Sequence, residues 1–144
     1  MKKTATVLAL IALGTAAFAH GGVTNKDVMA RMMVMGTISE QMKVIGSMAK
    51  GETDFDADVA NAALIEIAAQ SAQVPSMFET PATDPKSEAL PVIWEQWDSF
   101  AARAQDAEAA AERLAGTVVA QSDLGPVLRQ VGETCKACHS TFRE

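Results

Sequence analysis

The C-terminal segment ETCKACHSTFRE places two thiols and an imidazole, those of Cys135, Cys138 and His139, within about one helical turn. These are the only two cysteines in the sequence. A C-x-x-C-H spacing is compatible with a zinc site, a redox-active dithiol, a simple disulfide or the covalent attachment of a c-type haem. The other residues of the chain help to decide between these chemistries.

Three of the four chemistries fit poorly. A structural zinc ion needs four ligands, and the only other histidine is His20, near the start of the chain. A thioredoxin-like dithiol is expected at the start of a helix, where the helix dipole lowers a thiol pKa, whereas this pair falls in the last turns of a predicted helix. A disulfide leaves His139 without a role. Haem attachment uses all three side chains, because two thiols on one turn can form thioethers and the adjacent imidazole can bind the iron.

The first nineteen residues have the pattern of a secretory signal peptide. Two lysines precede an apolar run from Val7, and small residues end at Ala19. The run is shorter than the roughly 20 residues that a membrane helix needs, and no later segment is long and apolar enough to span a membrane. We therefore expect residues 1–19 to be removed and residues 20–144 to form one exported domain, as haem attachment of this kind requires in bacteria.

The charge of the mature chain limits its partners. Without Lys2 and Lys3 it has 10 basic and 18 acidic residues, a net charge of −8. This balance argues against nucleic acid or an anionic membrane as a partner. It favours basic protein partners, although an acidic surface also serves solubility alone.

Apolar residues recur at helical spacing through most of the chain, and strand signals are nearly absent. The pattern predicts helices over about 25–50, 56–73, from Pro91 to about 118, and from about 122–126 to 142. Four of the five prolines fall between Pro75 and Pro91 and predict a loop there. Four amphipathic helices with mostly short connections predict an all-α, antiparallel (up-down-up-down) four-helix bundle whose last helix binds the haem.

The segment GETCKACHSTFR, on the last of four helices, resembles the class II c-type cytochromes, the cytochrome c-prime family. The similarity covers nearly all of residues 20–144, including Arg31 and Met35, the M-x-x-I-x-x-M-A-K-G-E run ending at Glu52, and the proline-rich loop after Met77-Phe78. One departure is Glu79, where relatives commonly have proline. The resemblance implies one covalent haem c, a left-handed bundle in the periplasm, redox protein partners there and a homodimer through the first two helices.

The second axial ligand of the iron separates two functions. The first and last helices are predicted to be antiparallel neighbours, so the residue facing His139 lies near the start of the first helix. At a rise of 1.5 Å per residue, Met32 and Met35 lie roughly 10–15 Å along it, whereas Met42 and Met48 lie roughly 25 Å or more along it and are expected in the core. The resemblance places Met35 opposite the iron, as in the low-spin, Met-ligated cytochrome c-556 branch. Met32, or an open site, remains an alternative.

The resemblance also assigns two arginines to the haem. It implies that Arg31 contacts a haem propionate and that Arg143 lies at the haem edge, while the alternative for each is a solvated charge. The predicted function is electron transfer through a His/Met-ligated haem; the alternative is a five-coordinate, high-spin haem that binds nitric oxide or carbon monoxide. No acid/base pair or nucleophile is evident, so we do not expect an enzyme.

Overall fold

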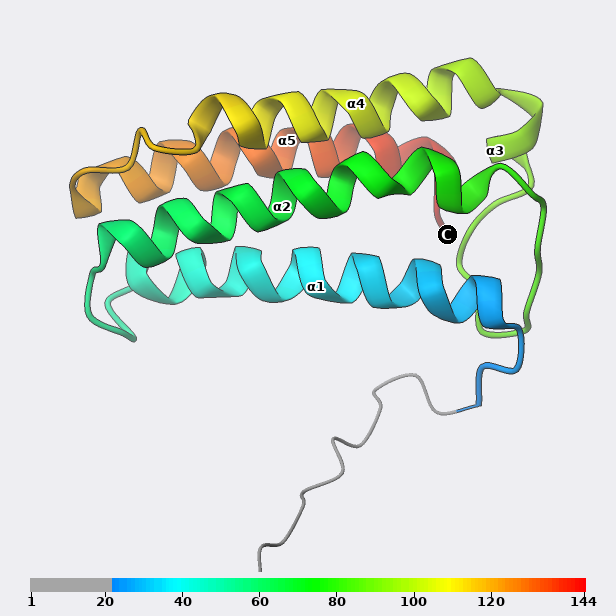
Figure 1. The fold of residues 1–144 in the computed structure, drawn as a ribbon, viewed down its shortest axis with the longest axis horizontal. Coiled ribbons are helices and arrows are strands. Elements are labelled where there is room, and N and C mark those ends of the chain that lie inside the picture. Colours follow the sequence, from blue (N-terminus) through cyan, green and yellow to red (C-terminus); the bar gives the residue numbers. More distant parts are fainter. Residues whose placement is uncertain (1–21) are drawn as a thin grey trace, which may run out of the picture.

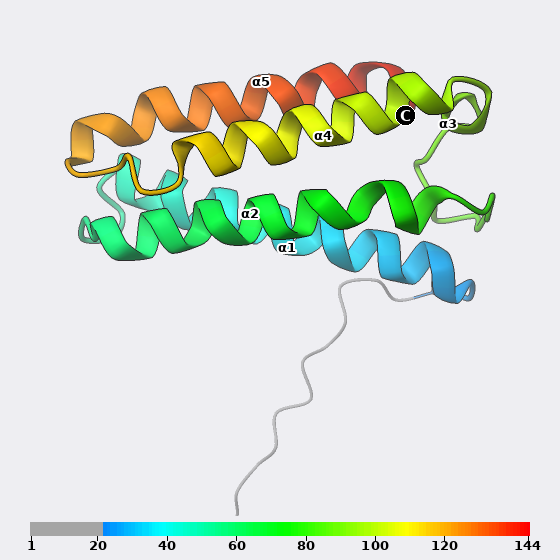
Figure 2. The ribbon, with the colours of Figure 1, turned by 45° about the horizontal axis from the view of Figure 1, so that its top comes forward.

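The computed structural model describes residues 22–144, so the predicted signal peptide, residues 1–19, lies outside the described part. Four long helices, α1 (Lys26–Ala49), α2 (Ala57–Phe78), α4 (Trp97–Leu114) and α5 (Leu124–Phe142), run antiparallel to their neighbours (Figure 1). A short helix α3 (Val92–Glu95) precedes α4, and a 3-10 turn (Gln121–Asp123) precedes α5. Figure 2 shows α1 and α2 as one layer and α4 and α5 as the other. The predicted all-α, up-down-up-down four-helix bundle is confirmed.

The start of each of the first two helices is fixed by a side-chain cap. The Asn25 side chain accepts hydrogen bonds from the backbone N–H groups of Asp27 and Val28 at the start of α1. Asp56 does the same for the first turn of α2. Such caps satisfy donors that have no partner within the helix. Between the two helices the chain turns at Gly51, whose φ of +72° is a left-handed conformation that favours glycine.

Helix α2 continues past Pro75 and ends at Phe78, whereas the sequence pattern predicted a loop from Pro75 onward. Pro75 falls in the last turn, where its missing N–H removes a single hydrogen bond. Val74 and Phe78 on either side of it are both buried. Tertiary packing therefore sustains the helix beyond its proline. Val59, in the first turn of the helix, is exposed.

The single helix predicted after Pro91 is interrupted at Gln96, whose φ of −121° and ψ of 44° are not helical. The indole N–H of Trp94, in α3, donates to the Phe78 carbonyl at 2.7 Å, which ties the interruption to the end of α2. The predicted helix also stops early, at Leu114 instead of 118, because Gly116 adopts a φ of +81°.

Buried residues form two clusters. The aliphatic cluster lies between the halves of the helices near the α1–α2 and α4–α5 connections and comprises Ile45, Met48, Ala60, Ala63, Leu64, Ile67, Ala68, Ala111, Leu114, Val118, Leu124, Val127 and Val131. The aromatic cluster lies toward the opposite end and comprises Val34, Val74, Phe78, Ile93, Phe100, Ala104 and Phe142. No helix within residues 22–144 is long and apolar enough to cross a membrane.

Candidate functional site

A cavity of about 340 Å³ opens at the end of the bundle where α1 begins and α5 ends. Its walls come from α1, the end of α2, the α2–α3 connection, α3, α4 and α5. The lining side chains are Val28, Arg31, Met32, Met35, Gly36, Phe78, Lys86, Ser87, Glu88, Ala89, Ile93, Phe100, Cys138, His139, Phe142 and Arg143. Most of them are apolar, so the cavity suits a ligand with a large apolar surface.

The C-x-x-C-H motif lies on the last turns of α5, beside this cavity. Cys135 and Cys138 are both free thiols and both half-buried. Three residues apart on a helix, they lie on the same face. Cys138 lines the cavity and packs against the aromatic cluster, while Cys135, one turn earlier, packs against the aliphatic cluster. His139 is half-buried and lines the cavity next to Cys138.

Burial sets the protonation tendencies of the motif. It lowers the pKa of His139, the charge of Arg143 lowers this pKa further, and Glu88 opposes both. A lowered pKa favours the neutral imidazole, which is the form that binds a metal. Burial also raises the pKa of the Cys135 thiol and that of the Cys138 thiol. For Cys138 the neighbouring thiol adds to this effect and the positive charge of Arg103 opposes it.

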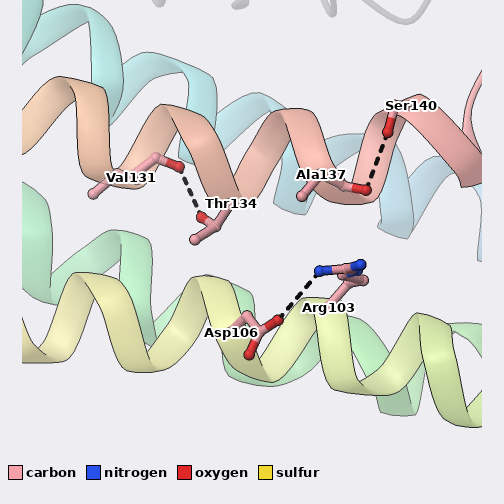
Figure 3. A network of polar contacts seen from close by, with 6 residues as sticks. All are labelled: Arg103, Asp106, Val131, Thr134, Ala137 and Ser140. Carbon is pink, nitrogen blue, oxygen red and sulfur yellow. Dashed lines mark hydrogen bonds and ion pairs between the residues drawn. The ribbon is translucent and has the colours of Figure 1, made fainter.

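Several polar side chains near the motif form their hydrogen bonds or ion pairs outside the cavity (Figure 3). The hydroxyls of Thr134 and Ser140 donate to carbonyls of their own helix, those of Val131 at 2.7 Å and Ala137 at 3.2 Å. On α4, Arg103 pairs with Asp106 at 3.8 Å. None of these residues lines the cavity. These side chains therefore add no polar atoms to the wall of the cavity.

Four of the six methionines of α1 lie at two levels of the bundle. Met32 and Met35 line the cavity together with His139, and Met35 also packs against the aromatic cluster, as Cys138 does. Met42 packs against the aliphatic cluster, and Met48 is buried within it. The structure thus places these side chains at the levels that the helical rise predicts. Ligation of the iron by Met35 stays a prediction.

Arg31 and Arg143 both line the cavity but differ in their surroundings. Arg31 is buried, with 4% of its surface exposed, and three of its guanidinium nitrogens donate to backbone carbonyls at and after the end of α2. A guanidinium has five N–H donors, so two remain for another acceptor such as a propionate. Arg143 is exposed and forms an ion pair with Glu88. The haem contacts expected of both arginines stay predictions.

The connection between α2 and α3, residues 79–91, is here called the strap. Four of its residues, Lys86 to Ala89, line the cavity, which sequence reasoning did not anticipate. The prolines of this segment predicted a loop, but a loop prediction does not say which surface the loop covers. The proximity of Glu88 to Arg143, 55 residues apart, gave no signal in the sequence.

The donor set suits a haem better than the alternatives considered from the sequence. Within residues 22–144 no three or more His, Cys, Asp or Glu side chains gather in a way that could hold a metal ion by themselves. Two free thiols, an imidazole and two thioethers instead lie along or beside one apolar cavity. These are the groups that attach haem c and ligate its iron in proteins.

Comparison with known proteins agrees with this chemistry. Residues 26–143 match the family model described as Cytochrome C'. The chain belongs to the cytochrome c' family. Proteins of this family are haem proteins of electron transport, and the family cofactor is one covalently bound haem c, consistent with the two cysteines of this chain.

Relatives in the family are named cytochrome c-556 as well as cytochrome c'. The chain is 34% identical over 115 residues to cytochrome c-556 of Agrobacterium tumefaciens, covering 79% of this chain and 91% of that protein. It is also 34% identical over 143 residues to cytochrome c' of Rhodopseudomonas palustris, covering 98% and 95%. The solved structure of cytochrome c' from Rhodopseudomonas palustris superposes with a TM-score of 0.76 at 32% identity, covering 84% of this chain and 98% of that one.

Proposed function

We propose that this cytochrome c' family member is an electron carrier with a low-spin haem, and not an enzyme. Cys135 and Cys138 would hold the haem through thioethers, and His139 and Met35 would be the axial ligands of its iron. The observation that carries the proposal is that Met35 lines the same cavity as His139 and packs against the same aromatic cluster as Cys138. When bound, the haem supplies one-electron exchange at its iron.

The residues of the chain favour ligation from both sides of the cavity. His139 is held on α5 with a lowered pKa, so its neutral form is favoured. Met35 lies on α1, a 24-residue helix that packs against both α2 and α5. Because both ligands stand on packed helices, they need little movement when the charge of the site changes. That property suits electron transfer.

The two arginines have distinct proposed roles. The two unused N–H donors of Arg31 are available to a haem propionate, and an Arg–carboxylate contact is a strong charge-assisted hydrogen bond. Arg143, exposed at the mouth of the cavity, would lie at the haem edge. We also propose a periplasmic location after cleavage behind Ala19, with redox proteins of that compartment as partners.

A homodimer through α1 and α2 is part of the proposal. Met33 on α1 and Ile65 on α2 are large apolar side chains that are 50% and 61% exposed, and a dimer through these helices would cover them. Sedimentation velocity at micromolar concentration should show a dimer that Ile65→Lys converts to a monomer. A monomeric unmutated protein would exclude this part of the proposal.

The test of the ligand assignment is an optical spectrum of the holoprotein, oxidised and reduced, with carbon monoxide uptake by the reduced form. The unmutated protein should be low-spin and take up carbon monoxide slowly, because the gas must displace a thioether held by a packed helix. Met35→Ala should give a high-spin spectrum and rapid uptake. Met42→Ala is the matched control, which should change stability and leave the spectrum unchanged.

Two other outcomes would overturn the assignment in different ways. A high-spin spectrum in the unmutated protein would place it in the five-coordinate branch that binds nitric oxide or carbon monoxide. A change of spectrum in Met32→Ala alone would keep the electron-transfer function and move the ligand by one turn.

A further inference from the structure

The strap is fastened to the start of α1 by two buried charged side chains that reach in opposite directions. The first is Arg31 of α1, which donates to carbonyls at the end of α2 and in the strap. The bonds run from Nε to Met77 at 2.9 Å, from Nη2 to Thr80 at 2.7 Å and from Nη1 to Ala82 at 3.1 Å. The guanidinium also lies 4.4 Å from the centre of the Phe78 ring and 5.6 Å from that of Trp94.

The second is Asp84 of the strap, which reaches back toward α1. Its carboxylate accepts hydrogen bonds from the backbone N–H groups of Thr24 at 2.9 Å and Asn25 at 3.1 Å, and from the Thr24 hydroxyl at 3.1 Å. It also accepts from the N–H of Lys86 within the strap at 2.9 Å. These backbone hydrogen bonds lower the pKa of Asp84 to about 2. We call Arg31 and Asp84, with these backbone partners, the clasp.

The charges of the clasp match the helix ends that they contact. The last carbonyls of α2 lack partners within the helix and carry partial negative charge, and the cation of Arg31 lies against them. The N–H groups before α1 carry partial positive charge, and the anion of Asp84 accepts from them. The start of α1 and the end of α2 lie at the same end of the bundle (Figure 1). Each charge therefore stabilises a helix end as well as the strap.

Beyond the clasp the strap crosses to the other side of the cavity. Its residues Lys86 to Ala89 line the cavity, and the segment then pairs with the end of α5. Leu90 N–H donates to the Phe142 carbonyl and Glu144 N–H to the Glu88 carbonyl, both at 3.0 Å. The strap thus joins α1, which carries Met35, to the end of α5, which carries His139.

We propose that Arg31 is a positioning residue which, with Asp84, holds the strap closed across the cavity. In this role it controls how readily a small molecule enters and keeps the first turns of α1, with Met35, against the site. The effect on ligation rests on the proposed function, while the closure of the strap does not. A direct contact between Arg31 and a propionate is a separate role, which the experiment must distinguish.

The experiment compares two variants of the holoprotein, Arg31→Lys and Asp84→Asn. Lysine keeps the positive charge but cannot donate in three fixed directions as guanidinium does. Asp84 lies outside the set of residues that line the cavity, so Asp84→Asn loosens the strap without touching the haem. Arg103→Lys, at an exposed arginine on α4, is the matched control.

Both clasp variants should speed amide hydrogen exchange in residues 79–90 by about tenfold or more, with the control unchanged. Both should also speed carbon monoxide uptake by the reduced protein several-fold. If Arg31→Lys changes the optical spectrum while Asp84→Asn leaves exchange and uptake at the unmutated values, Arg31 acts directly on the haem and the clasp proposal is wrong. Unchanged exchange in both variants would also overturn it.

The two proposals can fail separately. A high-spin unmutated protein would remove Met35 as a ligand, yet exchange in the strap would still report on the clasp. If Arg31→Lys does not fold, Asp84→Asn alone carries the test. This variant is expected to fold, because the asparagine side chain has nearly the same size and can still accept from the N–H groups of Thr24 or Asn25.

Discussion

The two clusters of buried residues differ in composition and in the space that they enclose. The aliphatic cluster contains no aromatic side chain and four of its members are alanines, which let helices approach closely. In the aromatic cluster, Phe100 lies 5.0 Å from Phe78 and 5.4 Å from Phe142, measured between ring centres. Large rings with few rotamers surround a space without filling it, and the cavity borders this cluster.

Because of this difference, the two ends of the bundle are stabilised in different ways. The aliphatic end is formed by the chain's own side chains, and none of the members of its cluster is more than 8% exposed. The aromatic end is closed on one side by the strap and leaves an apolar cavity for the haem, whose burial would contribute free energy in proportion to the apolar area removed from water. The two ends should therefore respond differently to mutation, and three predictions test this.

The largest effect is expected when the haem cannot be attached. Cys135→Ala combined with Cys138→Ala should give an exported chain that is degraded or poorly folded, because the aromatic end loses the group that fills it. Circular dichroism and the yield of protein measure this. In the unmutated protein, mass spectrometry should show residues 20–144 plus one haem that survives acid-acetone extraction. An apoprotein with an unchanged melting temperature would show that the aromatic end does not depend on haem.

A smaller effect is expected in the aliphatic cluster. Leu64 is fully buried there, so Leu64→Ala should lower the free energy of unfolding by about 2–5 kcal/mol. The optical spectrum of the haem should stay unchanged, because Leu64 does not line the cavity. Val119→Ala, at a side chain that is 78% exposed, is the control and should cost about 0.5 kcal/mol or less. A spectral change in Leu64→Ala would mean that the two ends are coupled.

The smallest effect is a pH dependence at the clasp. Hydrogen bonds from backbone N–H groups lower the pKa of Asp84 from an ordinary 3.8 to about 2. A folded-state pKa below the unfolded one stabilises the fold above the unfolded pKa, and this stabilisation is lost as the pH falls toward the folded pKa. The difference in unfolding free energy between the unmutated protein and Asp84→Asn should be constant above about pH 5 and shrink toward about pH 2. Denaturant titrations at several pH values measure it; a difference that grows on acidification contradicts the assignment.

The sequence predicted the fold and the groups that could bind a haem, but it did not predict that the strap lines the cavity. The helical period of the apolar residues predicted the bundle, and the rise of a helix was enough to bring Met32 and Met35, but not Met48, to the level of His139. The end of α2 was placed too early, because burial of Phe78 outweighs the local effect of Pro75. The partners of Arg31 could not be predicted, since they are backbone carbonyls and every residue has one.

Because Arg31 donates to backbone carbonyls, the side chains of the strap can vary without loss of these hydrogen bonds. Proline lacks an N–H but keeps its C=O, so Pro81 and Pro85 stiffen the strap without removing any acceptor that Arg31 uses. Glu79 is exposed and gives no carbonyl to Arg31. Side chains such as Glu79, Thr80 and Thr83 can therefore change the outer surface beside the cavity during evolution, or in engineering, while the anchor on α1 stays the same.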